Sequence, residues 1–539
     1  DRFGPLNRRP VERSAARWPA FRAKGIRVAE IAATTGQRFG TRRIAVVGGG
    51  ISGLAAAHRL VELDASLGVV VFEGADRLGG VLSTLQADGF QVERSADNFI
   101  TTNPWAVDLC RRLGLADELI ETNPRYRRTF IVRRGRLYPL PEGFMMMAPT
   151  RLWPMAVTPL LSPMGKLRAA MEYFIPPRRD EADESMADFV RRRLGREVFD
   201  RLVEPLVSAV YAADMERLSV LATLARFREM EREHGSLIRA MRRQMRRAGR
   251  STSAARESGA RYSLFVTLRS GLARLVEAIA ARLPPGAVRL GEQVTALEPV
   301  GRRWRVASVL GPRGAAALSA PATGAAAAVA PGPAAEAPGA PEEFDAVILA
   351  APSHVAARLL APLDAELGER LAAIEHSGTA IVSLGYDERQ IGHPLDGMGA
   401  VVPAVERSPI LACSFSSRKY AHRAPEGKVL LRVFVGGARR PELAEMDDAA
   451  LGALVLGAIE PLLRIDGAPC FCDIAHWPRT MPQFHVGHLE RIAEIRRRLE
   501  AWPGLELAGN AYRGVGIPDC IHTGEQAAER VVERLNRPF

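Results

Sequence analysis

Short apolar runs and helical periodicity follow one another closely in the early part of the chain. Residues 42–49 form a buried-strand pattern around four consecutive apolar residues, and apolar positions in 55–63 recur at helical spacing. A second apolar run at 68–74 predicts another strand. The pattern predicts a strand–turn–helix–strand unit of about thirty residues.

The middle of the chain is mainly helical in its periodicity. Residues 104–120 and 185–245 show helical spacing, the second with many charged positions. Between them, residues 140–177 are rich in proline, methionine and aromatic residues, which indicates an apolar, irregular surface. Residues 294–310 predict a strand, a turn and a second strand.

A low-complexity run rich in alanine, glycine and proline occupies residues 311–342. Such residues cannot build a core, so we expect a disordered insertion in a hairpin loop. The sheet pattern resumes at 344–352. Further elements are expected as strands at 380–386, 410–417 and 429–437, a helix at 447–463, and a strand, glycine-rich turn and helix over 505–535.

Composition places this chain of 539 residues among globular proteins of two or three domains, with 47% hydrophobic and 25% charged residues. The net charge of +12 comes almost entirely from arginine, since only four of the 73 basic residues are lysines. This charge suits a solvated surface, carboxylate-rich substrates or anionic lipid. We find no basic motif typical of nucleic-acid binding, so no nucleic acid partner is expected.

Five scattered cysteines predict a reducing compartment and no disulfide framework. Cys470 and Cys472 lack a second pair at zinc spacing, so no metal site is expected there. No stretch reaches the ~20 apolar residues of a membrane-spanning helix. Residues 1–41, rich in arginine and without an apolar signal region, are interpreted as an extension outside the fold.

Gly48, Gly50 and Gly53 match the pattern G-x-G-x-x-G between the first strand and the first helix. These glycines allow a tight turn, a close approach of the backbone to a diphosphate and close helix packing, while the helix N-terminus attracts the phosphates. Glu73 ends the second strand, where a carboxylate can accept hydrogen bonds from both ribose hydroxyls. The spacing predicts a dinucleotide site.

FAD is the preferred dinucleotide over NAD. Residues 74–80 add a second glycine pair and Arg77 next to Glu73, and residues 509–520 add a glycine-rich turn that opens a helix. Such a helix N-terminus suits the electron-rich edge of an isoalloxazine ring.

These segments together resemble the oxygen-dependent porphyrinogen oxidases of haem biosynthesis, which are FAD enzymes related to the amine oxidases. The resemblance spans roughly residues 42–533, with the pattern closest to the bacterial branch. The most specific matches are "LSPMGKLRAAMEYFIPPRR" (161–179), "RLVEPLVSAVYAADMERLS" (201–219), "EREHGSLIRAM" (231–241), "APEGKVLLRVFVGGAR" (424–439), "WPRTMPQFHVGHLERI" (477–492) and "GVGIPDCI" (514–521).

The resemblance implies non-covalent FAD and the residues that bind it. The implied contacts are Gly48, Gly49, Gly50, Ile51, Ser52, Gly53, Glu73, Arg77, Gly79 and Gly80, with the Val294 backbone at the adenine, Trp477 near the flavin, and Val515, Gly516 and Ile517 at the isoalloxazine ring. In "ERSADNF" (93–99), Ser95 and Ala96 replace the usual Gly-Pro, so this loop departs from the family pattern.

The implied reaction removes six electrons from a porphyrinogen, in three rounds that each reduce O₂ to H₂O₂. Because the flavin does the chemistry, no catalytic residue is assigned, and the His485-x-x-His488 pair is interpreted as structural rather than as a metal site. Arg128 or Thr129 would bind substrate carboxylates. Apolar clamps would come from Phe174, Thr379, Met398 and the methionines at 145–147.

The expected fold class is α/β, with a three-layer (ββα) Rossmann-like FAD domain, an inserted α+β substrate-binding domain and a helical segment that could face a membrane. The expected divisions are an extension at 1–41, FAD-binding parts at 42–103, 261–352 and 477–539, a helical and substrate- or membrane-facing region at 104–260, and the substrate-binding domain at 353–476. The insertion at 311–342 lies within the second FAD-binding part.

Several alternatives stay open from the sequence. Coproporphyrinogen III is slightly favoured over protoporphyrinogen IX because residues 125–136 are dense in arginine. An amine oxidase would need a lysine at the flavin, and no lysine lies on a strand expected to reach it. A carotenoid-type desaturase or a flavin-binding scaffold without turnover are further alternatives. We expect a cytoplasmic enzyme that could rest on the inner face of the membrane, and a homodimer is compatible with the sequence.

Overall fold

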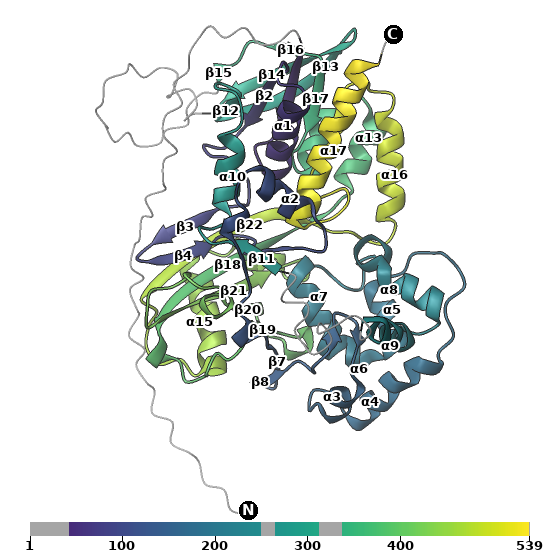
Figure 1. Cartoon of the computed structure of the whole chain (residues 1–539), viewed down its shortest axis with the longest axis vertical. Coiled ribbons are helices and arrows are strands. Elements are labelled where there is room, and N and C mark those ends of the chain that lie inside the picture. Colours follow the sequence, from purple (N-terminus) through teal and green to yellow (C-terminus); the bar gives the residue numbers. More distant parts are fainter. Residues whose placement is uncertain (1–41, 249–264, 312–336, 538–539) are drawn as a thin grey trace, which may run out of the picture.

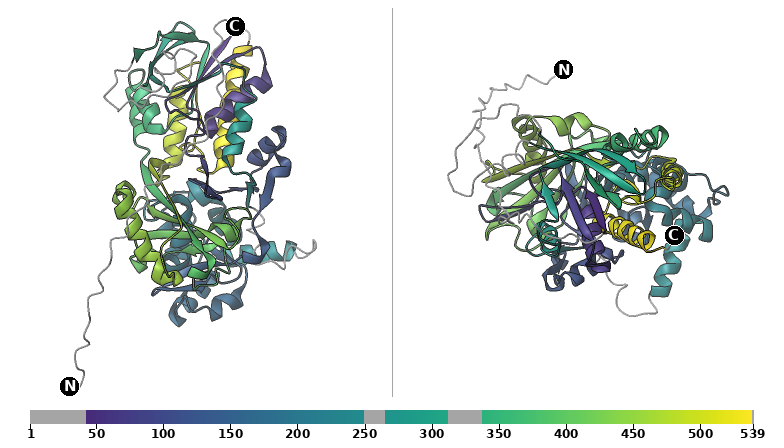
Figure 2. Two further views of the ribbon diagram at one scale, coloured as in Figure 1. Left: turned by 90° about the vertical axis from the view of Figure 1, so that its left-hand side faces the viewer. Right: turned by 90° about the horizontal axis from the view of Figure 1, so that it is seen from above.

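The computed structural model describes residues 42–248, 265–311 and 337–537. The chain forms two parts, stacked along the long axis (Figures 1 and 2). One part contains both the first helix, α1 (Ile51–Leu63), and the last, α17 (Ile517–Asn536), so the chain leaves this part and returns to it. The predicted extension at 1–41 and most of the predicted insertion lie outside the described residues.

A five-stranded parallel sheet is the centre of the first part, in the order β12-β2-β1-β17-β23. Its strands come from three separate stretches of the chain: β1 (Arg43–Val47), β2 (Gly68–Glu73), β12 (Val288–Leu290), β17 (Ala346–Leu349) and β23 (Leu505–Leu507). Successive residues of β1 are buried in different clusters, since Ile44 and Val46 face one side while Ala45 and Val47 face the other. Both faces of the sheet are therefore covered.

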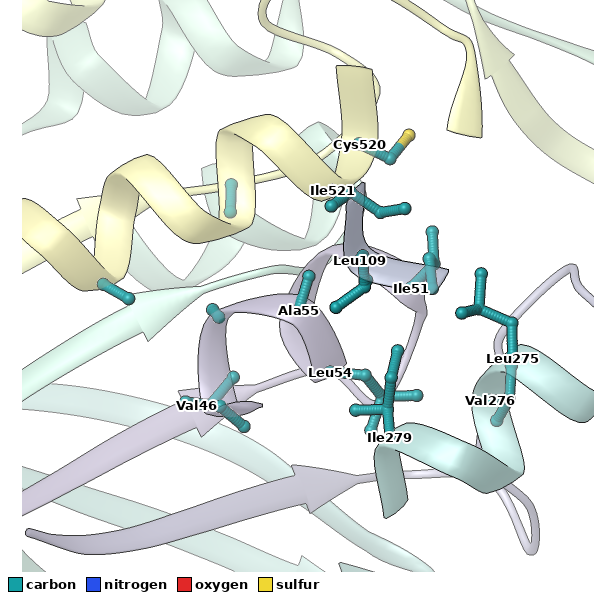
Figure 3. Close-up of a cluster of buried hydrophobic side chains, with 14 of the residues drawn as sticks. Val46, Ile51, Leu54, Ala55, Leu109, Leu275, Val276, Ile279, Cys520 and Ile521 are labelled. Carbon is teal, nitrogen blue, oxygen red and sulfur yellow. The ribbon is translucent and has the colours of Figure 1, made fainter. Parts of the chain in front are cut away.

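Helices cover one face of the parallel sheet, and a small antiparallel sheet covers the other. Figure 3 shows α1, α17, α2 (Trp105–Arg112) and α10 (Ala273–Ala280) joined by Leu54, Leu109, Ile279 and Ile521. On the opposite face lie the antiparallel strands β13 (Glu292–Val300) and β14 (Arg303–Leu310), with short β15 (Ala337–Pro338) and β16 (Glu342–Phe344) beside β14. This arrangement confirms the predicted three-layer fold class.

The second part is built on a seven-stranded sheet, the second sheet, in the order β22-β18-β21-β20-β19-β7-β8. Its strands are β7 (Thr129–Arg133), β8 (Arg136–Pro139), β18 (His376–Asp387), β19 (Gly399–Val401), β20 (Ile410–Phe415), β21 (Lys428–Gly436) and β22 (Phe471–Pro482). Helix α15 (Asp448–Leu463) packs on one face through Leu451, Val455 and Ile459.

A helical region with its own core adjoins this sheet. It comprises α3 (Leu152–Val157), α4 (Pro163–Ala170), α5 (Met186–Leu194), α6 (Arg196–Val198), α7 (Glu204–Tyr211), α8 (Val220–His234) and α9 (Leu237–Ala248). Shorter connections are β3 (Thr84–Ala87) with β4 (Phe90–Glu93), β5 (Phe99–Ile100) and β6 (Leu119–Glu121) with β11 (Phe265–Leu268), and β9 (Phe144–Met145) with β10 (Ala148–Pro149). Among the described residues, no helix has the length and apolar character needed to cross a membrane.

Three expected boundaries differ from the structure. Strand β22 runs across the expected division at 476/477, because it pairs with β18 along most of its length. Helices α12 (Ser353–Leu360) and α13 (Ala365–Ala372) pack in the core of the first part rather than in the substrate-binding domain. Residues 337–342, expected within the disordered insertion, include β15 and the start of β16.

Candidate active site

The glycine-rich turn after β1 leaves an open space at the start of α1. Gly48 has a φ of 111°, and a Cβ there would lie 2.6 Å from the carbonyl oxygen of Ala350. A Cβ on Gly53 would overlap the Gly48 carbonyl oxygen, so both positions require glycine. A Cβ on Gly50, in contrast, would meet no described atom within 4 Å. No described side chain caps the helix, so its N-terminus faces a space suited to an anion.

Glu73 lies at the end of β2 beside this turn. Its Oε2 accepts a hydrogen bond from the Gly49 N–H at 2.7 Å, and its Oε1 accepts one from Ala75 N–H at 2.8 Å. The backbone thus holds the carboxylate at the edge of the site, where the fingerprint of dinucleotide-binding folds places a ribose-binding acid.

The second glycine pair lies directly against the first turn. Gly79 N–H donates to the Gly49 carbonyl oxygen at 2.8 Å, and a Cβ on Gly80 would lie 3.3 Å from Gly50 Cα. Arg77 stabilises the turn over residues 77–82 by donating hydrogen bonds to the carbonyl oxygens of Gly80, at 2.5 Å, and Leu82, at 3.2 Å. Two turns distant by thirty residues in the sequence therefore form one wall of the space.

Further predicted FAD contacts lie on β13 and at the start of α17. Val294 is buried on β13 next to a register irregularity, which frees backbone from the regular ladder. Gly516 caps α17, whose N-terminus, like that of α1, carries no side-chain cap from the described residues. Ile517 is buried with α1 in the core of the first part, whereas Val515 packs against the helical region of the second part.

Segment 93–98, between β4 and β5, contacts the second sheet at β22. The Trp477 indole donates to the Arg94 carbonyl oxygen at 2.6 Å, and Arg94 pairs with Asp473, also on β22. Thr379 on β18 is the register partner of Trp477. Trp477, predicted near the flavin, is therefore a strand residue of the second sheet that holds this segment.

A cavity of about 970 Å³ opens beside segment 93–98, between the second sheet and the helical region. Of the predicted substrate contacts, Arg128, Thr129 and Met398 line it. Thr379 does not, and Phe174 is 79% exposed on the outer surface, so the structure does not support a substrate contact from Phe174. Met146 lines the cavity, while Met147 is buried in the helical core.

The cavity is mostly apolar but carries five basic side chains. Its walls include Phe144, Leu206, Phe265, Val401 and Phe434. The basic residues are Arg125, Arg127, Arg128, Arg151 and Lys419, of which Arg128 pairs with Asp396 at 2.7 Å and Arg151 pairs with Glu142 at 3.0 Å. This combination suits a large apolar ligand with peripheral carboxylates.

Sequence reasoning missed a polar group in the cavity wall, formed by Asp97, Asn98 and Lys419. Lys419 Nζ lies 3.1 Å from both carboxylate oxygens of Asp97, and the fully buried Arg432 lies behind them, with Nη1 3.4 Å from Asp97 Oδ2. Asp97 falls in the "ERSADNF" loop already noted for its departure from the family. Lys419 is a lysine in the cavity wall, which the sequence did not lead us to expect.

The described residues contain no cluster of side chains able to hold a metal ion. His488 is 1% exposed and stacks on Phe484 with ring centroids 4.2 Å apart. Burial lowers the pKa of His488 to about 4, so the ring is neutral in the ordinary pH range. His488 therefore packs as a core side chain.

Comparison with known proteins defines the class. The profile of the flavin containing amine oxidoreductase family matches residues 51–532, and the chain belongs to this family. It is 33% identical to the coproporphyrinogen III oxidase of Bacillus subtilis (strain 168), over 92% of this chain and 99% of the relative. It is 34% identical to the coproporphyrinogen III oxidase of Propionibacterium freudenreichii (91% and 90% covered) and 28% identical to the chloroplastic protoporphyrinogen oxidase of Nicotiana tabacum (91% and 86% covered).

Solved structures agree with the fold. A crystal structure from Exiguobacterium sp. 255-15, provisionally named protoporphyrinogen oxidase, has a TM-score of 0.78 at 30% identity, covering 93% of this chain and 100% of that one. Cyclohexylamine oxidase from Brevibacterium oxydans IH-35A shares the fold at a TM-score of 0.61 and 15% identity, covering 92% and 100%.

The predicted family, fold class, enzyme class and cofactor are confirmed: the protein is an FAD-dependent oxidoreductase. The geometry fits this cofactor. The open space at Gly50, the two uncapped helix N-termini and the carboxylate of Glu73 offer the anion-binding and ribose-binding groups that a dinucleotide needs.

Proposed function

We propose that this protein oxidises a porphyrinogen to the porphyrin with O₂ as electron acceptor, and that its preferred substrate is coproporphyrinogen III. The cavity carries this proposal, because it combines apolar walls with five basic side chains next to segment 93–98. The names of two bacterial relatives, both called coproporphyrinogen III oxidase, support it. Coproporphyrinogen has four carboxylates and protoporphyrinogen two, so a cavity with many basic groups favours the former.

In this proposal the FAD is held by the two glycine turns, Glu73 and the start of α17. Bound FAD supplies a hydride acceptor that O₂ reoxidises. The protein positions the macrocycle: apolar walls take up its faces, while Arg128 and the other arginines at the cavity bind its carboxylates. Met398, only 5% exposed on the segment before β19, contacts the ring edge.

We further propose that the helical region rests on a membrane surface at the cytoplasmic side. Exposed apolar side chains gather on α3, α4 and the turn that follows α4: Leu152, Trp153, Val157, Met164, Leu167, Met171 and Phe174. Exposed Arg242 and Arg243 lie on α9, which packs against that turn. Pro154 and Val157 of α3 also line the cavity, so a lipophilic substrate could reach it from this surface.

The test compares initial rates of porphyrin formation from coproporphyrinogen III and protoporphyrinogen IX, with the purified FAD-loaded protein under air and autoxidation subtracted. We expect a clear preference for coproporphyrinogen. Preference for protoporphyrinogen would overturn the assigned substrate. No rate above autoxidation with either, together with FAD reduction by an amine, would favour an amine oxidase in which Lys419 serves the flavin. FAD that stays oxidised with every substrate would favour a binding scaffold. Light scattering tests whether the protein is a homodimer.

A further inference from the structure

Asp97 stands out because it is a partly buried carboxylate in a cavity whose walls are mostly apolar and basic. The described lining residues include two carboxylates, Asp97 and Glu142. The side chain of Glu142 is 62% exposed and already paired with Arg151. The side chain of Asp97 is only 15% exposed and lies where segment 93–98 meets the cavity.

The contacts of Asp97 leave one acceptor site open. Its Oδ1 accepts hydrogen bonds from Asn98 Nδ2 at 2.5 Å and from Lys419 Nζ at 3.1 Å. Its Oδ2 accepts from Lys419 Nζ at 3.1 Å and from no other described donor, although Arg432 Nη1 lies 3.4 Å away as an ion pair. Since each carboxylate oxygen can accept two hydrogen bonds, Oδ2 can receive another donor from the cavity.

The neighbours of Asp97 keep it ionised and fixed in position. Burial alone would raise the pKa of Asp97, but Lys419, Arg432 and Arg423 hold it below its ordinary value. Arg432 also donates to the Ser95 carbonyl oxygen, which anchors the loop two residues before Asp97. The cations thus leave a charged acceptor facing an apolar space, where electrostatic interactions are strong.

A porphyrinogen presents the complementary chemistry. Its four pyrrole nitrogens all carry N–H donors and offer no acceptor, and its oxidation removes three hydrides and three protons. As a hydride leaves a meso carbon, positive charge spreads onto the neighbouring pyrrole nitrogens, and their N–H protons become acidic. The ring therefore needs an anionic hydrogen-bond acceptor at its centre, and its carboxylates need cations at its edge.

We propose that Asp97 is a catalytic residue that accepts hydrogen bonds from the pyrrole N–H groups and takes up the nitrogen-bound protons. The N–H bond breaks and an O–H bond forms on Asp97, the hydride and its electron pair pass to FAD, and O₂ finally accepts two electrons and two protons per round as H₂O₂. Of the three protons, two leave nitrogen, and the third leaves the remaining meso carbon. Lys419 and Arg432 act as positioning residues. This inference rests on the proposed function.

The test measures anaerobic reduction of bound FAD by coproporphyrinogen III in the wild type, in Asp97→Asn and in Asp364→Asn. Asp364 is a matched control, since its side chain is 17% exposed, pairs with Arg498, and lies on the other part of the molecule. Asparagine also preserves its role as the cap of α13. We expect the FAD reduction rate of Asp97→Asn to fall about 10²- to 10⁴-fold, as for loss of a general base, and that of Asp364→Asn to stay unchanged.

A second measurement separates chemistry from folding and binding. Affinity for coproporphyrin, followed by quenching of tryptophan fluorescence, should change less than about tenfold in Asp97→Asn, because the arginines that bind its carboxylates and the apolar walls remain. If Asp97→Asn does not retain FAD, Asp97→Glu replaces it, and reduction should again slow because the carboxylate is displaced. A wild-type rate in the FAD-loaded variant would overturn the inference alone. A wild-type protein whose FAD no porphyrinogen reduces would overturn the proposed function as well.

Discussion

Gly50 and Gly457 are two glycines with open space where a Cβ would be, yet only one of these spaces belongs to the site. At both, an added Cβ would meet no described atom within 4 Å. Gly50 has an extended backbone with a φ of −71°, which any residue adopts, and Gly457 lies on the exposed face of α15. Alanine should therefore be tolerated structurally at either position.

We expect Gly50→Ala to fold but to bind FAD at least about tenfold more weakly, because the new methyl occupies the space in front of the α1 N-terminus. Titration of the FAD-free protein, followed by flavin fluorescence, measures this. Gly457→Ala is the control and should keep its FAD affinity while gaining about 1 kcal/mol of unfolding free energy. Equal FAD affinity in both variants would show that this space does not hold the cofactor.

The site was partly predictable at this scale. The glycine spacing and Glu73 predict the turn geometry that the structure has, since backbone geometry at a strand–helix turn depends on neighbouring residues. Asp97 could not be joined to Lys419 and Arg432 in this way, because it precedes both by more than 300 residues and meets them only in the folded chain. For Phe174 the difficulty is a local one. An aromatic residue in an apolar segment has the same sequence pattern whether its side chain faces a cavity or solvent.

At the scale of elements, α9 begins on a fully buried ion pair. Glu172 accepts hydrogen bonds from the N–H groups of Leu237 at 2.8 Å and Ile238 at 3.2 Å, and from Ser236 Oγ at 2.6 Å, while Arg193 pairs with it. Neither Glu172 nor Arg193 is exposed. The carboxylate thus caps α9 and neutralises Arg193 at the same time.

Glu172→Ala should lower the unfolding free energy by about 3–5 kcal/mol, because it removes a fully buried carboxylate from the Arg193 guanidinium and leaves the N–H groups at the start of α9 without their acceptor. Chemical denaturation of the FAD-loaded protein measures this loss. Glu229→Ala, on the exposed face of α8, should change the unfolding free energy by no more than about 0.5 kcal/mol. A loss below about 1 kcal/mol for Glu172→Ala would contradict the assigned cap.

The proposed membrane surface also belongs to this scale. Trp153 and Phe174 are 75% and 79% exposed, so replacing both with serine removes apolar area without opening a core. Sedimentation with vesicles containing anionic lipid should show weaker binding of this double variant, by about tenfold or more. The matched control is Val405→Ser, an exposed apolar residue that belongs to neither α3, α4 nor the turn after them. Wild-type protein that stays in the supernatant would refute the surface.

At the scale of the whole molecule, the chain crosses between the two parts at several places, and the sequence pattern does not mark these crossings. Three strands of the second sheet, β18, β20 and β21, follow expected apolar runs, because a short continuous apolar run is a local signal. Strands β7 and β8 were not expected, since their arginines suggested a binding stretch rather than a sheet edge. The boundary at β22 was missed because its partner β18 lies almost a hundred residues earlier.

Histidines gather where the two parts meet. His354 and His376 lie with ring centroids 5.2 Å apart, and His485 forms a bridge to Leu218 of the helical region, three residues before the buried His488. Burial lowers the pKa of all four, to about 4 for His376 and His488. The folded protein therefore binds fewer protons than the unfolded chain, whose histidines titrate near 6.5.

Stability from these histidines should be complete above about pH 6.5 and should be lost as the pH falls towards 4, because protonation then favours the unfolded chain. For His488, which is 1% exposed, the loss should be on the order of 2–3 kcal/mol. Melting temperature followed from pH 7.5 to pH 4.5 should fall less steeply in His488→Phe than in the wild type, since phenylalanine stacks on Phe484 without titrating. His422→Gln, at an exposed position, should keep the wild-type slope. If the melting temperatures of His488→Phe and the wild type fall equally with pH, protonation of His488 does not destabilise the folded protein.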